Sequence, residues 1–210
     1  MEPFRRVTSI PIPLLRDNID TDIIMPARYL KTVTRSGLGQ HIFENWRKRP
    51  DGSLDPAFPL NDPRYQGAAI LVAGRNFGCG SSREHAVWGL VDRGIRVVIA
   101  ESFADIFASN AVKNGLLTVE LARADLDRIA ATGEAGRTVT VDLEACCILL
   151  ADGVRIAFSV DPFRRRCLLE GLDEVTLTLA RHADAIRAFE DRQRAAAPWL
   201  WETPTTRIAH

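Results

Sequence analysis

One stretch, 68-AAILVAGRNFGCGSSREHAVWGLVDRGIRVVIA-100, contains strand and helix patterns in alternation. The apolar runs at its two ends are typical of buried strands, and apolar residues recur at helical spacing over 85–94 before a terminating glycine. Beyond it, the pattern predicts a helix over 103–115 and a third strand over 116–121. Strands that alternate with helices over short links favour parallel pairing with right-handed crossovers. The stretch therefore predicts an α/β fold.

The rest of the chain is expected to complete one domain. Residues 1–67 hold most of the prolines and predict loops with short strands. Alternation over 137–143 and the turn 151-ADG-153 predict an antiparallel meander. We therefore expect a single α/β domain over 1–198, with a mixed sheet and flanking helices, and a flexible tail over 199–210.

Charge and hydropathy exclude some classes of protein. Lys plus Arg and Asp plus Glu both number 27, so bulk charge favours neither nucleic acid nor an acidic membrane surface. No apolar run approaches the ~20 residues of a membrane span, and no signal-peptide core follows the first residues. We expect a cytoplasmic protein that binds neither nucleic acid nor membrane.

The cysteines do not have the spacing of a metal site. They lie at positions 79, 146, 147 and 167, and neighbouring residues of a strand point to opposite faces, so Cys146 and Cys147 cannot grip one metal together. In a reducing compartment they are expected to be small buried side chains. We expect no metal or iron–sulfur site within this chain.

The turn 74-GRNFGCGSSREHAVWG-89 joins a predicted strand to a predicted helix. Free N–H groups and the positive end of the helix dipole at such a turn favour an anion. The turn has no Gly-Lys-Ser/Thr, and Arg83 replaces the third glycine of the dinucleotide-binding pattern. It therefore predicts an anion site other than the common phosphate loops.

Several roles remain open on these residues alone. Neither Ser81 nor Ser82 has the flanking glycines of a hydrolase nucleophile. Cys79 is the best lone nucleophile, because a helix N-terminus lowers a thiol pKa. Ser81 or Ser82 could also cap the helix, with Glu84 completing a capping box. A stand-alone Cys/Ser hydrolase, an anion-binding module and a purely structural turn are the alternatives to a larger enzyme.

Several motifs resemble one known family. The segment 76-NFGCGSSREHA-86 closely resembles the signature of 3-isopropylmalate dehydratase small subunits, and its Gly80–Ala86 core resembles the swivelling fourth domain of aconitases. Three further segments follow the family's pattern: 18-NIDTDIIMPARYLKTVTRSGLG-39, 102-SFADIFASNAVKNGLL-117 and 161-DPFRRRCLLEGLDEVTLTL-179. The resemblance covers about residues 7–195 and implies a single swivelling β/β/α domain.

The resemblance implies half of an enzyme. In this family a large subunit holds a 4Fe-4S cluster through three cysteines, and the small partner closes over it to form a heterodimer or heterotetramer. This chain would bind no cofactor itself and would be active only with that partner. The complex would interconvert 2-isopropylmalate and 3-isopropylmalate, a pair of small dicarboxylates, by dehydration and rehydration in leucine biosynthesis.

The resemblance also assigns roles to individual residues. It implies that Ser81 is the base, acting as an alkoxide, and that Arg83 stabilises this anion and binds a substrate carboxylate. Asp22 would arrange the active site through contact with the proton-transfer groups. Arg35 and Ser82 would bind substrate.

The resemblance also bears on supporting residues and on the choice of substrate. His85 is expected to orient its neighbours, and Leu30 and Val33, in the loop 29-YLKTVTRSG-37, to line a pocket for an isopropyl group. Small subunits of citraconate or 2-methylmalate hydratase, homoaconitase and dimethylmalate dehydratase are similar, and they are the alternatives within the superfamily.

Overall fold

The computed structural model describes residues 1–81 and 83–201, and of Glu174 the backbone alone. The chain divides into two compact units, Met1–Leu172 and Asp173–His210. Among the described residues, no helix is both long enough and apolar enough to span a bilayer.

A parallel sheet forms the centre of the first unit. Its strands have the order β2 (Pro11–Leu14), β3 (Ile70–Ala73), β4 (Val97–Ala100) and β5 (Leu117–Glu120), and every neighbouring pair is parallel. All residues of β3 and β4 are buried because both faces of the sheet are covered. The predicted parallel pairing is confirmed.

A second sheet is antiparallel. Its order is β1 (Arg6–Ser9), β6 (Val139–Asp142), β7 (Cys147–Leu149) and β8 (Arg155–Ala157). The strands thus divide between two sheets, and the expected single mixed sheet is not formed. The cause is the pairing of β1 with β6, which joins the predicted meander to β1 and not to β5. One residue separates β1 from β2, so the chain passes directly from the antiparallel sheet to the parallel sheet.

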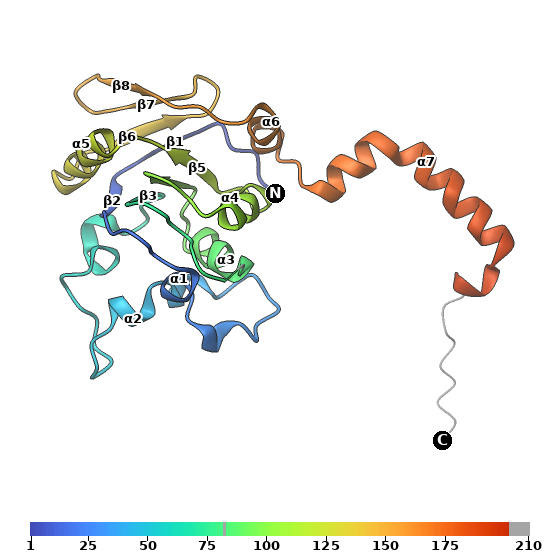
Figure 1. Cartoon of the computed structure of the whole chain (residues 1–210), viewed down its shortest axis with the longest axis horizontal. Coiled ribbons are helices and arrows are strands. Elements are labelled where there is room, and N and C mark those ends of the chain that lie inside the picture. Colours follow the sequence, from blue (N-terminus) through green and yellow to red (C-terminus); the bar gives the residue numbers. More distant parts are fainter. Residues whose placement is uncertain (82, 202–210) are drawn as a thin grey trace. The chain divides into compact units, whose positions relative to one another are not determined.

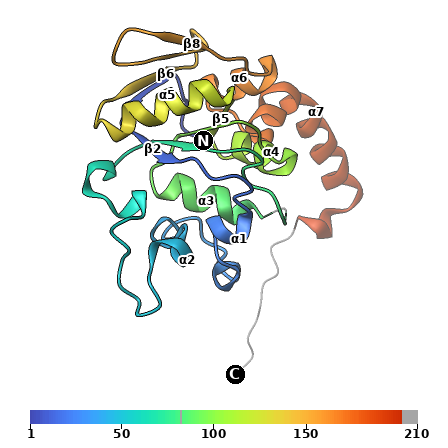
Figure 2. The same cartoon turned by 60° about the vertical axis from the view of Figure 1, so that its left-hand side comes forward.

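Helices α3 (Glu84–Asp92) and α4 (Asp105–Lys113) cover the parallel sheet on the face away from the antiparallel sheet (Figures 1 and 2). Alternate residues of β3 and β4 contribute to two separate cores. One core lies between the sheets and includes residues of α5 (Arg123–Glu134) and α6 (Pro162–Glu170). The other includes residues of α3 and α4. These layers confirm the expected β/β/α architecture.

The first 67 residues hold two short strands, β1 and β2, as predicted, and the predicted loops after β2 contain short helical turns. The helices are α1 (Thr21–Ile24) and α2 (Glu44–Arg47). Short 3-10 turns lie at Ala27–Tyr29, Gly39–His41, Pro59–Asn61 and Pro63–Tyr65.

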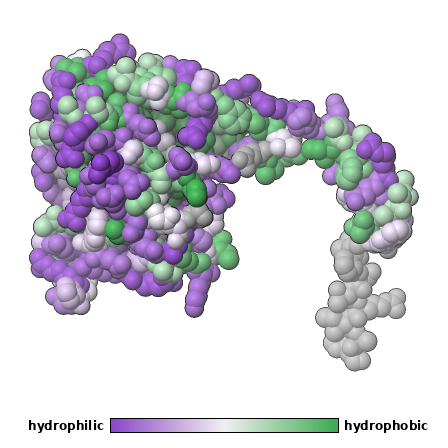
Figure 3. Space-filling view, viewed as in Figure 1, coloured by the Kyte–Doolittle hydropathy of each residue, from purple (hydrophilic) through white to green (hydrophobic). Residues whose placement is uncertain are grey.

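In its described part, the second unit contains α7 (Glu174–Ala196), whose helical backbone is interrupted at His182, and a turn at Pro198–Leu200. Large hydrophobic side chains of this unit, such as Phe189 and Trp199, are exposed. Figure 3 shows hydrophobic surface, in green, at several places along α7. The predicted tail over 199–210 lies outside the described residues from position 202 onward, and the domain boundary at 198 stays a prediction.

Candidate active site

Two sequence motifs meet where β3 gives way to α3. The chain at 18–21 runs parallel to the chain at 76–80, with an isolated bridge between Asp20 and Cys79. The amide of Gly78 donates to the carbonyl of Ile19 at 2.7 Å, and the amide of Thr21 donates to the carbonyl of Cys79 at 2.9 Å. The glycine-rich turn is therefore held by the segment that carries Asp22.

Gly78 is fixed in the turn by close packing. Its φ is +75°, which favours glycine, and a Cβ there would lie 2.2 Å from Cγ of Phe107. Phe77, fully buried, packs its ring edge-on against Phe107 at a centroid distance of 5.2 Å. The close approach to Phe107 leaves no room for a side chain at Gly78.

Ser81 is exposed at the end of this turn. Its carbonyl accepts a hydrogen bond from Oγ1 of Thr21 at 3.0 Å and another from the amide of Arg83 at 2.8 Å. The backbone of the serine is thus fixed while its side chain faces solvent. Ser82, the other predicted serine, lies outside the described residues.

The turn does not form the capping box considered from the sequence. The N-cap of α3 is Arg83, whose side chain makes no capping bond. Glu84 instead accepts a hydrogen bond from Nδ2 of Asn114 at 2.7 Å, because α4 ends beside the start of α3. Capping by the Ser81–Glu84 pair therefore does not explain the motif.

Arg83 and Asp22 are brought together. Nη1 of Arg83 forms an ion pair with Oδ1 of Asp22. Asp22 lies in the first turn of α1, where Asp20 is the capping residue and accepts from the amide of Ile23 at 2.7 Å. Because Asp20 already caps α1, the carboxylate of Asp22 is available to orient the guanidinium of Arg83.

The residues 30–37, called here the Arg35 loop, lie against the start of α3. Nε2 of His85 is 3.0 Å from the carbonyl oxygen of Thr32, and the guanidinium of Arg35 lies 5.1 Å from the centre of the Trp88 ring. The buried indole N–H of Trp88 has no hydrogen-bond partner among the described residues. His85 and Trp88 thus connect the start of α3, which follows Ser81, to the Arg35 loop.

The two apolar residues expected to line a substrate pocket differ in burial. Leu30 is partly buried, whereas the side chain of Val33 is 90% exposed. Val33 would therefore line a pocket only if another surface covered it.

Cys79 is a poor nucleophile in this setting. Burial, and after it the charge of Asp20, raise the pKa of its thiol. The direction is opposite to the one expected from its place before a helix. None of the four cysteines forms a disulfide, and the described part of the chain holds no group of three His, Cys, Asp or Glu that could bind a metal.

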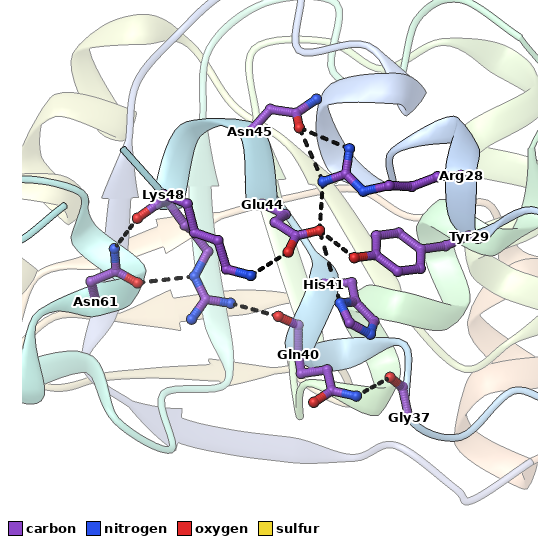
Figure 4. Close-up of polar contacts among 10 residues, drawn as sticks. Arg28, Tyr29, Gly37, Gln40, His41, Glu44, Asn45, Lys48 and Asn61 are labelled. Carbon is purple, nitrogen blue, oxygen red and sulfur yellow. Dashed lines mark hydrogen bonds and ion pairs between the residues drawn. The ribbon is translucent and has the colours of Figure 1, made fainter. Parts of the chain in front are cut away.

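A buried carboxylate that the sequence did not reveal, Glu44, lies at the start of α2 among residues from both sides of the Arg35 loop (Figure 4). Glu44 is 7% exposed and accepts hydrogen bonds from Arg28, Tyr29 and Lys48. Burial raises the pKa of Glu44, but these hydrogen bonds outweigh it and lower the pKa to about 2. The carboxylate is therefore ionised at any working pH.

Family models match almost the whole chain. Residues 1–124 match the aconitase C-terminal domain, residues 127–162 match a model described as LeuD_N, and residues 174–201 match the C-terminal domain of the 3-isopropylmalate dehydratase small subunit. The first match contains every residue of the candidate site.

Individual relatives agree with these models. The 3-isopropylmalate dehydratase small subunits of Paramagnetospirillum magneticum and Xanthobacter autotrophicus are each 50% identical over 202 residues, which is 95% of this chain and 100% of the relative. A crystal structure of 3-isopropylmalate dehydratase from Methanocaldococcus jannaschii is similar with a TM-score of 0.63 and 30% identity, over 88% of this chain and 99% of that one.

Proposed function

This chain belongs to the 3-isopropylmalate dehydratase small-subunit family of the aconitase superfamily, and from that premise we propose that the turn before α3 is half of an active site, completed by a large subunit. The function is that of a hydro-lyase component: with its partner it interconverts 2-isopropylmalate and 3-isopropylmalate in leucine biosynthesis. We expect it to act in the cytoplasm. The observation that carries the residue assignment is the Arg83–Asp22 ion pair beside the exposed Ser81.

The reaction needs a base. Dehydration removes a proton from a carbon next to a carboxylate, and the hydroxyl leaves from the neighbouring carbon to give an alkene. In our proposal the proton passes to Oγ of Ser81. A serine alkoxide needs strong stabilisation, which the N-terminus of α3 and the charge of Arg83 would supply.

Arg83 and Arg35 would hold the two carboxylates of the substrate. A guanidinium binds a carboxylate through two parallel hydrogen bonds, so its orientation decides where the carboxylate lies. Asp22 fixes the orientation of Arg83, and the Trp88 ring lies beside Arg35. In rehydration, Ser81 returns the proton to the alkene carbon from which the hydroxyl left. The hydroxyl adds to the alkene carbon from which the proton was taken.

An iron–sulfur cluster does not fit this chain. The four cysteines form no disulfide, and no three ligating side chains gather among residues 1–81 and 83–201. We therefore place the 4Fe-4S cluster expected for this family on the large subunit. The chemistry of this chain is confined to binding, orientation and proton transfer.

Anaerobic reconstitution with the large subunit tests the proposal. Alkene formation is measured with 2-isopropylmalate, citraconate and homoaconitate, for the isolated chain and for the complex. We expect turnover by the complex alone, and fastest with isopropylmalate. Activity of the isolated chain would overturn the division of the site between two subunits, and a preference for citraconate or homoaconitate would overturn the substrate.

A further inference from the structure

The two ends of the Arg35 loop converge on a single side chain, Glu44. Arg28 and Tyr29 lie immediately before the loop, in the turn Ala27–Tyr29, and His41 lies just after it, in the turn Gly39–His41. All of them surround the carboxylate of Glu44 at the start of α2 (Figure 4). This convergence is a further feature of the site that the proposed function does not use.

Each oxygen of Glu44 has its own partners. Oε2 accepts from Nη2 of Arg28 at 2.6 Å and from the hydroxyl of Tyr29, and it lies 3.9 Å from Nδ1 of His41. Oε1 accepts from Nζ of Lys48, one turn along α2. The oxygen that faces the loop therefore contacts residues from both of its ends.

Because Glu44 is buried, its carboxylate depends on these donors. An ionised carboxylate removed from water needs hydrogen-bond donors, and charged donors are the strongest. Tyr29 and His41 also stack on each other, with ring centroids 3.9 Å apart and planes 18° apart. Removing the carboxylate would leave the hydroxyl of Tyr29 without this acceptor and would leave Arg28 with the longer hydrogen bonds to Oδ1 of Asn45, at 3.3 Å.

The loop between these ends is lightly held. All its residues except Leu30 and Thr32 are exposed. Its described links to α3 are the contact of Thr32 with His85 and that of Arg35 with Trp88. The position of Arg35 therefore depends strongly on where the ends of the loop are fixed.

We propose that Glu44 is a positioning residue for substrate binding, which holds both ends of the Arg35 loop and thereby places Arg35. The inference rests on the proposed function for the meaning of Arg35, but the anchoring itself is independent of that function. Glu44 touches neither substrate nor reacting atoms and acts through Arg28, Tyr29 and His41.

Limited trypsin digestion of the isolated chain tests the anchoring. Lys31 and Arg35 are exposed cleavage sites within the loop, and cleavage after each is followed by mass spectrometry. We expect Glu44→Ala to accelerate both cleavages about tenfold, because cleavage follows the population of the opened loop. Glu44→Gln should give a smaller increase, since its amide oxygen can still accept from Arg28 or Tyr29.

A second buried carboxylate provides the matched control. Asp142 is 8% exposed, pairs with Arg6 and lies in the antiparallel sheet, away from the loop. Asp142→Asn should leave cleavage after Lys31 and Arg35 at the wild-type rate. Equal acceleration by Asp142→Asn and Glu44→Ala, or no acceleration by Glu44→Ala, would overturn the proposal.

The reconstituted complex tests the consequence for substrate. A loosened Arg35 weakens binding in ground state and transition state alike, so Glu44→Ala should raise KM about tenfold and leave kcat within about twofold. A loss of folded protein would lower the apparent kcat at constant KM, and that result would overturn the positioning role. If the wild-type complex does not act on isopropylmalate, the proposed function fails, while the digestion result still decides whether Glu44 anchors the loop.

Discussion

Arg83 and Asp22, 61 positions apart in the sequence, form an ion pair within the candidate site. The Asp22 side chain is 52% exposed, so solvent screens the pair, and exposed pairs of this kind contribute about 0–1 kcal/mol to stability. The pair therefore matters for the direction of the guanidinium far more than for the free energy of unfolding.

Asp22→Asn should separate these two effects. Without the carboxylate the guanidinium of Arg83 loses its fixed orientation. Misplacement of a group that binds substrate costs on the order of 100-fold in rate. We expect that loss in kcat/KM of the reconstituted complex, together with an unchanged midpoint of urea unfolding.

The control for this variant is Asp127→Asn, which breaks an exposed pair with Arg123 on α5. It should change neither the rate nor the unfolding midpoint. Full activity of the Asp22→Asn complex would show that Arg83 needs no partner to be placed.

Gly78→Ala should destabilise the turn by packing as well as by backbone strain. The new Cβ would lie 2.2 Å from the Phe107 ring, at a φ of +75°. We expect a loss of about 3 kcal/mol in the free energy of unfolding, measured in urea. Gly153→Ala, with φ +86° and no atom within 4 Å of the added Cβ, should lose only the conformational part, about 1 kcal/mol. Equal losses at the two glycines would contradict the packing argument.

Glu44 should make stability depend on pH in the acid range. Its pKa in the folded protein, about 2, lies below the ordinary value of 4.5, so its stabilisation is complete above pH 4.5 and is lost as the pH falls toward 2. At neutral pH the contribution is on the order of 3 kcal/mol. The difference in unfolding free energy between the wild type and Glu44→Gln should therefore shrink steadily from pH 5 to about pH 2. A difference that stays constant over this range would show that the carboxylate titrates normally.

His85 should act on the Arg35 loop through a single hydrogen bond. Donation from Nε2 to the carbonyl of Thr32 requires the tautomer that carries its proton on Nε2. His85→Ala loses this bond, and we expect KM to rise about fivefold, which corresponds to one ordinary hydrogen bond. His85→Gln can place an amide donor near the same point and should stay closer to the wild type. Identical KM values for the two variants would exclude this contact as the reason.

The local pattern of the sequence was sufficient for the parallel half of the fold. Apolar runs separated by helical periodicity predicted β3, α3, β4, α4 and β5, because each element shows its own periodicity over a few residues. The division into two sheets was not predictable in this way. It depends on the pairing of Arg6 with Asp142, a contact between distant segments that leaves no local signal.

Residues of the site were predictable only where they lie in motifs shared with the family. The resemblance to the family predicted Asp22 and Arg83 as site residues, and in the structure they form an ion pair. Glu44 was missed because α2 is a single turn, too short for any periodicity, and nothing in the sequence indicates that this glutamate is buried. Its contacts with Arg28 and Tyr29 form only in the folded chain, so the sequence does not show that these residues lie together.

Replacement of Ser81 by alanine in the anaerobically reconstituted complex tests the central claim most directly. The variant should still assemble with the large subunit, because the serine is exposed and its described hydrogen bonds involve the carbonyl oxygen, which alanine also has. We predict that alkene formation from 2-isopropylmalate falls by at least about 100-fold, the contribution of a general base. An assembled Ser81→Ala complex that forms the alkene at the wild-type rate would contradict the assignment of the base to this chain.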